Sequence, residues 1–205
     1  MPYTLNEDSP DIEIIGRVIA GDTDEFEAIV RKYSAYVYKI AASYVPQEAV
    51  SEAAHEAFVN AFAGISSFNA KSQFKYWLRT ITIRSCYDYW RTHYKSRELT
   101  MSSLGEDHQR WFQRVVNEDA VGLFRDSEMQ KETVEIINWA MSELAPVERM
   151  TVTLIYLEGY SVKEAAQMLN LSMVNVKVRA HRARTKLRKK ILSHIDFNKL
   201  KEGIL

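Results

Sequence analysis

The sequence has few of the residues that cross-link or interrupt regular structure. Its 205 residues include one cysteine, four prolines and seven glycines. Because Cys86 has no second cysteine to pair with, a disulfide bond within the chain is impossible, which fits a reducing cytoplasm. We expect Cys86 to pack inside a helix rather than to react. The scarcity of glycine and proline, with no sustained alternation of apolar and polar residues, predicts an all-α protein.

Long apolar runs are also missing. No stretch approaches the roughly 20 apolar residues of a membrane helix, and no apolar run follows a basic N-terminus. We therefore predict a cytoplasmic protein with no membrane segment.

Motifs that would support catalysis are absent from the sequence as well. It contains no metal-ligand cluster, no phosphate-binding glycine loop and no nucleophile with an evident base. His55 and Glu56 resemble the start of a zinc-protease motif, but Val59 stands where the second histidine is required. We predict no metal, no cofactor and no enzymatic activity, and an enzyme acting on nucleic acid is the least favoured alternative.

Charge is balanced overall but distributed unevenly along the chain. The 27 Lys and Arg residues equal the 27 Asp and Glu residues, so the formal net charge is zero. Local segregation of charge permits DNA binding without general adhesion to polyanions. The stretch from Ser172 to Lys190 contains no acidic residue, and its cations are Lys177, Arg179, Arg182, Arg184, Lys186, Arg188, Lys189 and Lys190.

The same basic stretch has the pattern of the second helix of a helix-turn-helix motif. Ser161 and Glu164 have capping-box spacing, Asn170 tolerates a left-handed turn, and Ser172 can cap the following helix. The second helix of such a motif enters the major groove of DNA. A membrane surface or an acidic protein partner remains an alternative, which the capped first helix and the tight turn make less favoured. The apolar stripe that would dock this helix is Val176, Ala180, Ala183, Leu187 and Ile191.

The N-terminal half predicts three helices before residue 65. Apolar residues recur at helical spacing from Ile14 to Ile19, from Phe26 to Tyr44 and from about Gln47 to Ala63. The third of these helices has a row of acidic residues on its outer side, which is either an ordinary solvated face or a binding surface. The row is Glu48, Glu52 and Glu56.

Residues 65 to 97 predict a long helix with an unusual outer face. Its inner positions are Phe74, Trp77, Leu78, Ile81 and Ser85. Cations interleaved with aromatic rings suit a single nucleic-acid strand, because phosphates attract cations and unstacked bases stack on rings. The alternative is that about half of the aromatic residues pack on neighbouring helices. The outer residues include Lys75, Tyr76, Arg79, Arg84, Tyr87, Trp90, Arg91 and Lys95.

A change in composition divides the chain into two small helical domains. Residues 98–130 contain seven acidic and three basic residues with scattered Ser and Gly, which predicts a flexible acidic linker. The expected domains are therefore 1–97 and 131–205. In the second domain, Pro146 should open a helix that runs through Ile155 and is closed by Gly159.

Three segments together carry a family resemblance. They are FKYWLRTITIRSCYDYWR (Phe74 to Arg91), LAPVERMTVTLIYLEGYSVKEAAQML and LSMVNVKVRAHRARTKLR. In this order they resemble a bacterial extracytoplasmic-function (ECF) sigma factor of the sigma-70 family, over about Asp22 to Arg97 and Ile136 to Ile191. The resemblance implies a non-enzymatic subunit that binds core RNA polymerase, melts the promoter minus-ten element with the first domain and reads the minus-35 element with the second.

The resemblance also implies roles for particular residues. Lys177, Val178, His181 and Arg182 match base-reading positions, and the outer face of the Phe74 to Lys95 helix would handle the minus-ten strand. The remaining residues implied at the minus-35 element are Ser172, Asn175 and Arg179. Those implied at core polymerase are Glu48, Ser51, Glu52, His55, Glu56 and Phe58.

Some positions depart from the family pattern. The helix that binds polymerase usually begins close to Asp-Ala-Glu-Asp-Leu, but two of those carboxylates are replaced by Ala49 and Ser51. One hypothesis is that phosphorylation of Ser51 restores the charge; the alternative is that the acidic row suffices. Arg84 replaces a usual asparagine and Val178 a small polar residue, so promoter preference should be unusual.

The sequence leaves alternatives open for the regulator of this protein and for its function. The implied regulator is an anti-sigma factor or a Ser/Thr kinase. The main rival function is a helix-turn-helix regulator that acts without joining polymerase.

Overall fold

The computed structural model describes residues 10–70, 72–96 and 136–201, and every regular element in these ranges is a helix. The predicted all-α class is confirmed. The chain divides into two compact units, Met1–Tyr89 and Trp90–Leu205. The predicted linker 98–130 lies outside the described residues, so the linker and the domain boundaries at 97 and 131 stay predictions.

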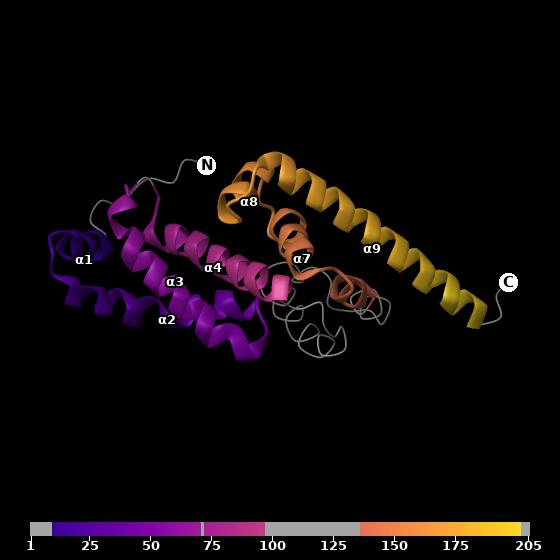
Figure 1. The fold of residues 1–205 in the computed structure, drawn as a ribbon, viewed down its shortest axis with the longest axis horizontal. Coiled ribbons are helices and arrows are strands. Elements are labelled where there is room, and N and C mark those ends of the chain that lie inside the picture. The colour runs from indigo at the N-terminus through magenta and orange to yellow at the C-terminus, as the bar shows by residue number, and fades with distance from the viewer. Residues whose placement is uncertain (1–9, 71, 97–135, 202–205) are drawn as a thin grey trace. The chain divides into compact units, whose positions relative to one another are not determined.

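The first unit consists of three α-helices and most of a fourth, whose residues from Trp90 on fall in the second unit. Short helical turns join these helices. The helices are α1 (Pro10–Ile19), α2 (Phe26–Ala42), α3 (Val50–Gly64) and α4 (Phe74–Ser96). One 3-10 turn precedes α2 (Thr23–Glu25), and two others flank α3 (Gln47–Ala49 and Ile65–Ser67). In Figure 1, α2, α3 and α4 run alongside one another.

Packing of α2 against α3 forms the centre of the first unit. The apolar stripe predicted for α2 is buried except at Val30, which is half-buried. The facing side of α3 is built largely from alanines, whose small side chains let two helices approach closely. All of the predicted inner residues of α3 are buried: Val50, Ala53, Ala54, Ala57, Phe58 and Ala61.

Aromatic rings join α4 to this centre. The Phe74 ring contacts Tyr33 of α2, with ring centroids 5.5 Å apart, and Phe68 in the preceding loop, at 5.4 Å. Edge-to-face pairs of this kind contribute about 0.5–1.5 kcal/mol beyond the area they bury. The N-terminal end of α4 is therefore held against α2 by ring contacts.

Helix α4 is buried on more sides than one stripe predicts. Leu78, Thr82, Ile83 and Cys86 are all inaccessible to solvent, although only Leu78 belongs to the predicted inner set. The Thr82 hydroxyl tolerates burial because it donates to the carbonyl oxygen of Leu78, 2.9 Å away. Burial raises the pKa of the Cys86 thiol to about 12, so the thiol stays protonated and inert, as expected.

A buried carboxylate ties α1 to α2. Asp11 accepts hydrogen bonds from the Tyr33 hydroxyl and the Lys32 ammonium, each at 2.5 Å. Burial raises the pKa of the Tyr33 hydroxyl, and the Asp11 carboxylate raises it further, so Tyr33 remains a proton donor. A buried charge of this kind is stable only because it is paired and hydrogen-bonded.

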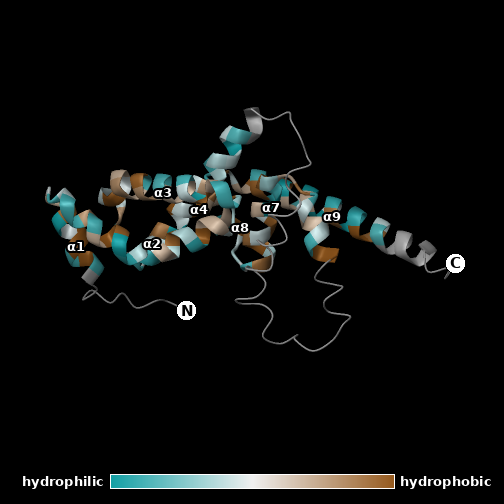
Figure 2. Cartoon of the chain, turned by 90° about the horizontal axis from the view of Figure 1, so that it is seen from below, coloured by the Kyte–Doolittle hydropathy of each residue, from teal (hydrophilic) through white to brown (hydrophobic). Residues whose placement is uncertain are grey.

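The second unit is also a helical bundle. It contains a helix over residues 136–142, then α7 (Pro146–Val152), α8 (Val162–Met168) and α9 (Met173–Lys201). Figure 2 shows hydrophilic and hydrophobic residues alternating along α9, as in an amphipathic helix. The Met141, Leu144 and Val152 side chains form a core cluster with Ala183 of α9.

The helix opened by Pro146 is not regular to its predicted end at Ile155. After Val152 the backbone widens into a π-helical turn over Thr153–Leu157, in which the Glu158 amide donates to the carbonyl oxygen of Thr153. Gly159, at φ +74°, then ends the segment as predicted, because its missing Cβ permits a left-handed conformation.

A buried arginine joins α7 to the end of the preceding helix. Its guanidinium donates to the carbonyl oxygens of Met141 at 3.0 Å, Leu144 at 3.1 Å and Ser142 at 3.4 Å. Desolvation lowers the pKa of this residue, Arg149, to about 10, so the side chain remains charged at neutral pH. One side chain thus satisfies the carbonyls that end helix 136–142.

We predict that Arg149→Lys lowers the free energy of unfolding of the second unit by about 2–3 kcal/mol, because one ammonium cannot reach all three carbonyls. Urea unfolding of the full chain, followed by circular dichroism, measures this change. The matched control is Arg184→Lys on the exposed side of α9, which should shift stability by no more than about 0.5 kcal/mol. Equal midpoints for the two variants would contradict the proposed role of Arg149.

Candidate nucleic-acid interface

The turn between α8 and α9 has the predicted caps. The Ser161 hydroxyl accepts from the Glu164 amide at 3.2 Å, and the Glu164 carboxylate accepts from the Ser161 amide at 2.8 Å. Hydrogen bonds from Ser161 hold the pKa of the Glu164 carboxyl below its usual range. Asn170 adopts φ +50°, and Ser172 caps α9 by accepting from the Asn175 amide at 3.1 Å. The predicted helix-turn-helix is confirmed.

Helix α9 docks through the first part of its predicted stripe. Val176, Ala180 and Ala183 are buried, whereas Leu187 and Ile191 are only half-buried. The helix packs on both α7 and α8 through this side. Its opposite side is left facing outward along the N-terminal turns.

Most of the residues expected to read the minus-35 element lie on that outward side. Arg179 is half-buried, and the other six are exposed. Their accessibility is compatible with the roles implied for them, and DNA contact by each stays a prediction. The exposed six are Ser172, Asn175, Lys177, Val178, His181 and Arg182.

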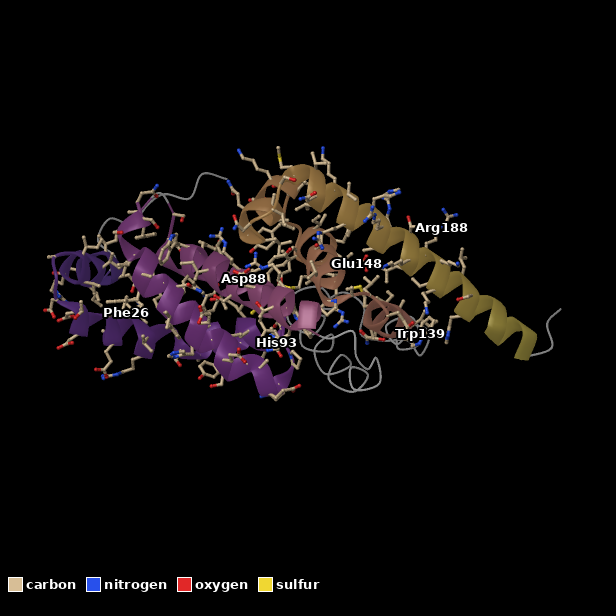
Figure 3. All side chains as sticks on the ribbon, viewed as in Figure 1. Phe26, Asp88, His93, Trp139, Glu148 and Arg188 are labelled. Carbon is tan, nitrogen blue, oxygen red and sulfur yellow. The ribbon has the colours of Figure 1, made fainter. Side chains whose placement is uncertain are left out.

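Two cations of the basic stretch form ion pairs with acidic residues of the same unit, although both remain exposed. Lys186 donates to both carboxylate oxygens of Glu148, each at 2.8 Å, and Lys190 pairs with Glu143 at 2.5 Å. In Figure 3, Glu148 lies beneath α9 while Arg188 projects from the other side of the helix. Local sequence patterns could not reveal pairs that join positions 38 and 47 residues apart. The exposed cations left for a ligand on the outward side are Lys177, Arg182, Arg184, Arg188 and Lys189.

The face of α4 expected to contact a single strand is exposed only in part. Tyr87 and Trp90 are 6% and 8% exposed, so their predicted place on the outer face is wrong. The reason is that α4 is buried on more than one side. Lys75, Tyr76 and Arg91 are exposed, Arg79 and Arg84 are half-buried, and the Lys95 side chain lies outside the described residues. The alternative that about half of the aromatic residues pack inside fits this outcome better.

The outer side of α3 carries the residues expected to bind polymerase, with one exception. Phe58 is buried and belongs to the core, so it offers no free surface in this structure. The Ser51 hydroxyl lies 3.5 Å from the Tyr38 hydroxyl of α2. Near the other end of the row, the Asn60 amide donates to Glu56 at 3.3 Å and to Ser85 of α4 at 3.2 Å. The exposed members are Glu48, Ser51, Glu52, His55 and Glu56.

The described ranges contain neither a grouping of metal-ligand side chains nor a membrane-spanning helix. Within residues 10–70, 72–96 and 136–201, no three His, Cys, Asp or Glu side chains are grouped so as to hold a metal ion. Over the same ranges, no helix is both long and apolar enough to cross a membrane.

A capped two-helix motif with a cationic outer helix defines the class of the chain, a DNA-binding protein of the helix-turn-helix type. Comparison with family models narrows the class further. Residues 29–96 match Sigma-70 region 2, and residues 135–187 match Sigma-70, region 4. The chain belongs to the sigma-70 family, as an ECF sigma factor. Sigma factors are not a class of enzymes.

Two ECF sigma factors are similar to this chain along most of its length. The ECF RNA polymerase sigma factor SigW of Bacillus subtilis (strain 168) is 27% identical over 178 residues, which cover 86% of this chain and 94% of that protein. The ECF RNA polymerase sigma-E factor of Escherichia coli (strain K12) is 25% identical over 187 residues, covering 91% and 97%. The solved sigma factor RpoE, in complex with the anti-sigma factor NepR from Bartonella quintana, is 19% identical with a TM-score of 0.44, covering 82% of this chain and 96% of that chain.

The ion pair between Lys186 and Glu148 leads to a prediction about how DNA affinity depends on salt concentration. Lys189→Ala should weaken binding to every promoter variant alike and reduce the slope of log affinity against log salt by about 0.9, the value of one phosphate contact. Lys186→Ala, the matched control, should change the slope much less, because the Lys186 ammonium already pairs with Glu148. Filter binding of the polymerase complex to promoter duplex at several salt concentrations measures both slopes. Identical slopes for the two variants would show that the ion pair with Glu148 does not keep Lys186 from contacting DNA phosphate.

Proposed function

We propose that the chain binds core RNA polymerase in the cytoplasm and directs it to promoters by contacting two separate elements. The observation that carries this proposal is the presence, in one chain and in this order, of segments that match Sigma-70 region 2 and region 4. A regulator that acts alone needs only the second. The partners are thus core polymerase and promoter DNA, without a membrane.

In this proposal α9 reads the minus-35 element as a duplex. Lys177, Val178, His181 and Arg182 contact base edges near the N-terminus of the helix, where helix-turn-helix proteins read sequence. Ser172, Asn175 and Arg179 contact phosphate or support the reading residues. The capping of α9 by Ser172 supports this arrangement, because it fixes the first turn of the helix that would enter the groove.

Helix α4 contacts the minus-ten element. Lys75, Tyr76 and Arg91 are exposed. Burial of Tyr87 and Trp90 means that these rings would stack on bases only after they become uncovered. The remaining members of the proposed set are Arg79, Arg84 and Lys95.

The outer side of α3 binds polymerase. Glu48, Glu52 and Glu56 supply negative charge, Ser51 and His55 lie between them, and all five are exposed. Phe58 contributes through the core of the unit, by holding α3 in position.

Run-off transcription tests the proposed function. Purified core polymerase, the full chain and a pool of genomic promoters should together yield specific transcripts that neither protein yields alone. The variant Arg182→Ala should shift the preferred promoters at one base pair, since a bidentate base contact is worth about 1–3 kcal/mol of discrimination. Tight duplex binding by the free chain, with no transcription in the presence of core, would favour the regulator that acts without polymerase.

We also propose that a Ser/Thr kinase phosphorylates Ser51. Ser51 is exposed in the first turn of α3, where the partial positive charge of a helix N-terminus favours a phosphate group. A phosphate would add about −1.5 to −2 charges beside Glu48 and Glu52, in place of the carboxylates that the family pattern has there. The Tyr38 hydroxyl is near enough to donate to it.

Two variants of Ser51 decide this question. Ser51→Glu should bind core polymerase more tightly than Ser51→Ala, as measured by fluorescence anisotropy of labelled protein. The control Ser66→Glu adds the same charge at an exposed serine beyond the other end of α3. Equal affinity of Ser51→Ala, Ser51→Glu and the wild type would end the phosphorylation hypothesis and leave the acidic row as sufficient. An anti-sigma factor then remains the predicted regulator.

A further inference from the structure

We infer that Val174 and Val178 form an apolar row that recognises the 5-methyl groups of thymines in the duplex bound by α9. The inference rests on the proposed function and deepens it, by naming a feature of the DNA that the chain selects. Val174 is 68% exposed and Val178 is 41% exposed, although both are aliphatic and lie in the first two turns of the helix. The described part of the second unit leaves most of the Val174 side chain, and a large part of the Val178 side chain, uncovered.

The position of the row follows from the docking of α9. Val174 and Val178 each lie two residues from Val176, which is completely buried. Two residues correspond to about 200° of rotation around an α-helix, so both valines point away from the docked side. Because they are four residues apart, their side chains are neighbours on that outward side.

Charges on either side of the row identify its partner as duplex DNA. Lys177, Arg184 and Arg188 lie along one edge of the outward side, and Arg182 and Lys189 lie along the other, all of them exposed. Two cationic edges about an uncharged centre complement a major groove, whose two phosphate backbones border the edges of the bases. A hydrophobic protein partner would have no such need for cations on both sides.

The chemistry of valine then selects among bases. Valine donates and accepts no hydrogen bonds, so it cannot read the polar pattern of a base pair. The apolar group that the major groove presents is the thymine methyl. Valine also favours the helix less than Ala, Leu or Lys, so helix formation does not explain two exposed valines here. Their stiff side chains suit a contact that depends on shape.

Replacement of single thymines by deoxyuridine tests the inference, because deoxyuridine lacks only the 5-methyl group. The complex of full chain and core polymerase first selects duplexes from a random library, and each thymine of the selected minus-35 element is then replaced in turn. At one or more positions the replacement should weaken binding about fourfold, the value of one buried methyl group. With Val174→Ala or Val178→Ala, the penalty at that position should fall below about twofold.

The control variant is Leu192→Ala. Leu192 is 49% exposed on the same helix, and its position 18 residues beyond Val174 places it about 27 Å further along the axis. This variant should retain the full deoxyuridine penalty.

Several outcomes would overturn the inference. They are a selected element without thymine, no penalty from any replacement, or an equal loss of penalty in the valine variants and in Leu192→Ala. Normal DNA binding by the valine variants, combined with lost affinity for polymerase, would assign the row to a protein contact instead. Selection of no duplex at all by the complex would count against the proposed function itself, and so differs from all of these results.

Discussion

Docking of α9 through Val176, Ala180 and Ala183 is the constraint on which the second unit depends. The three buried side chains are small, so α9 lies close to the helices beneath it and cannot rotate without exposing them or burying a cation. Rotation is what matters for reading DNA, because it decides which side chains enter the groove. The caps at Ser161 and Ser172 fix where the two helices of the motif begin, and the docked stripe fixes which way the second one faces.

Ion pairs reinforce this orientation beside the docked side of α9. Lys186 and Lys190 are one turn apart and reach down to Glu148 and Glu143. Pairs between partly exposed groups contribute little free energy, about 0–1 kcal/mol each. Their more important effect is to divide the cations of α9 into those that hold the helix in place and those that remain for a ligand.

Local signals in the sequence predicted the second unit well. The capping box, the left-handed Asn170 and the closing Gly159 depend on neighbouring residues, so the residue types alone indicate the geometry. The pairing of Lys186 with Glu148 joins distant positions and could not be predicted from local pattern. The π-helical turn after Val152 had no signal either, because its residues also suit a regular α-helix.

In the first unit, the apolar pattern of the sequence predicted the buried residues of α2 and α3 but not those of α4. For α2 and α3 a single apolar stripe identified the buried residues, because each helix has one side in the core. Helix α4 has polar Thr82 and apolar Ile83 buried together, so no single stripe describes it, and the burial of Tyr87 and Trp90 went unpredicted. Assigning single-strand contacts to a helix therefore requires knowledge of which sides are covered, which a helical pattern alone does not give.

The inner and outer sides of α3 differ in how well they tolerate substitution, because alanines fill so much of the inner side. At Ala53, Ala54, Ala57 and Ala61 a larger side chain would not fit the packed inner side of α3, so these positions tolerate little change. Glu48, Glu52 and Glu56 on the outer side are exposed, so substitution of these residues should change stability by no more than about 0.5 kcal/mol. Carboxylates can therefore be gained or lost on this side of the helix while the architecture stays constant.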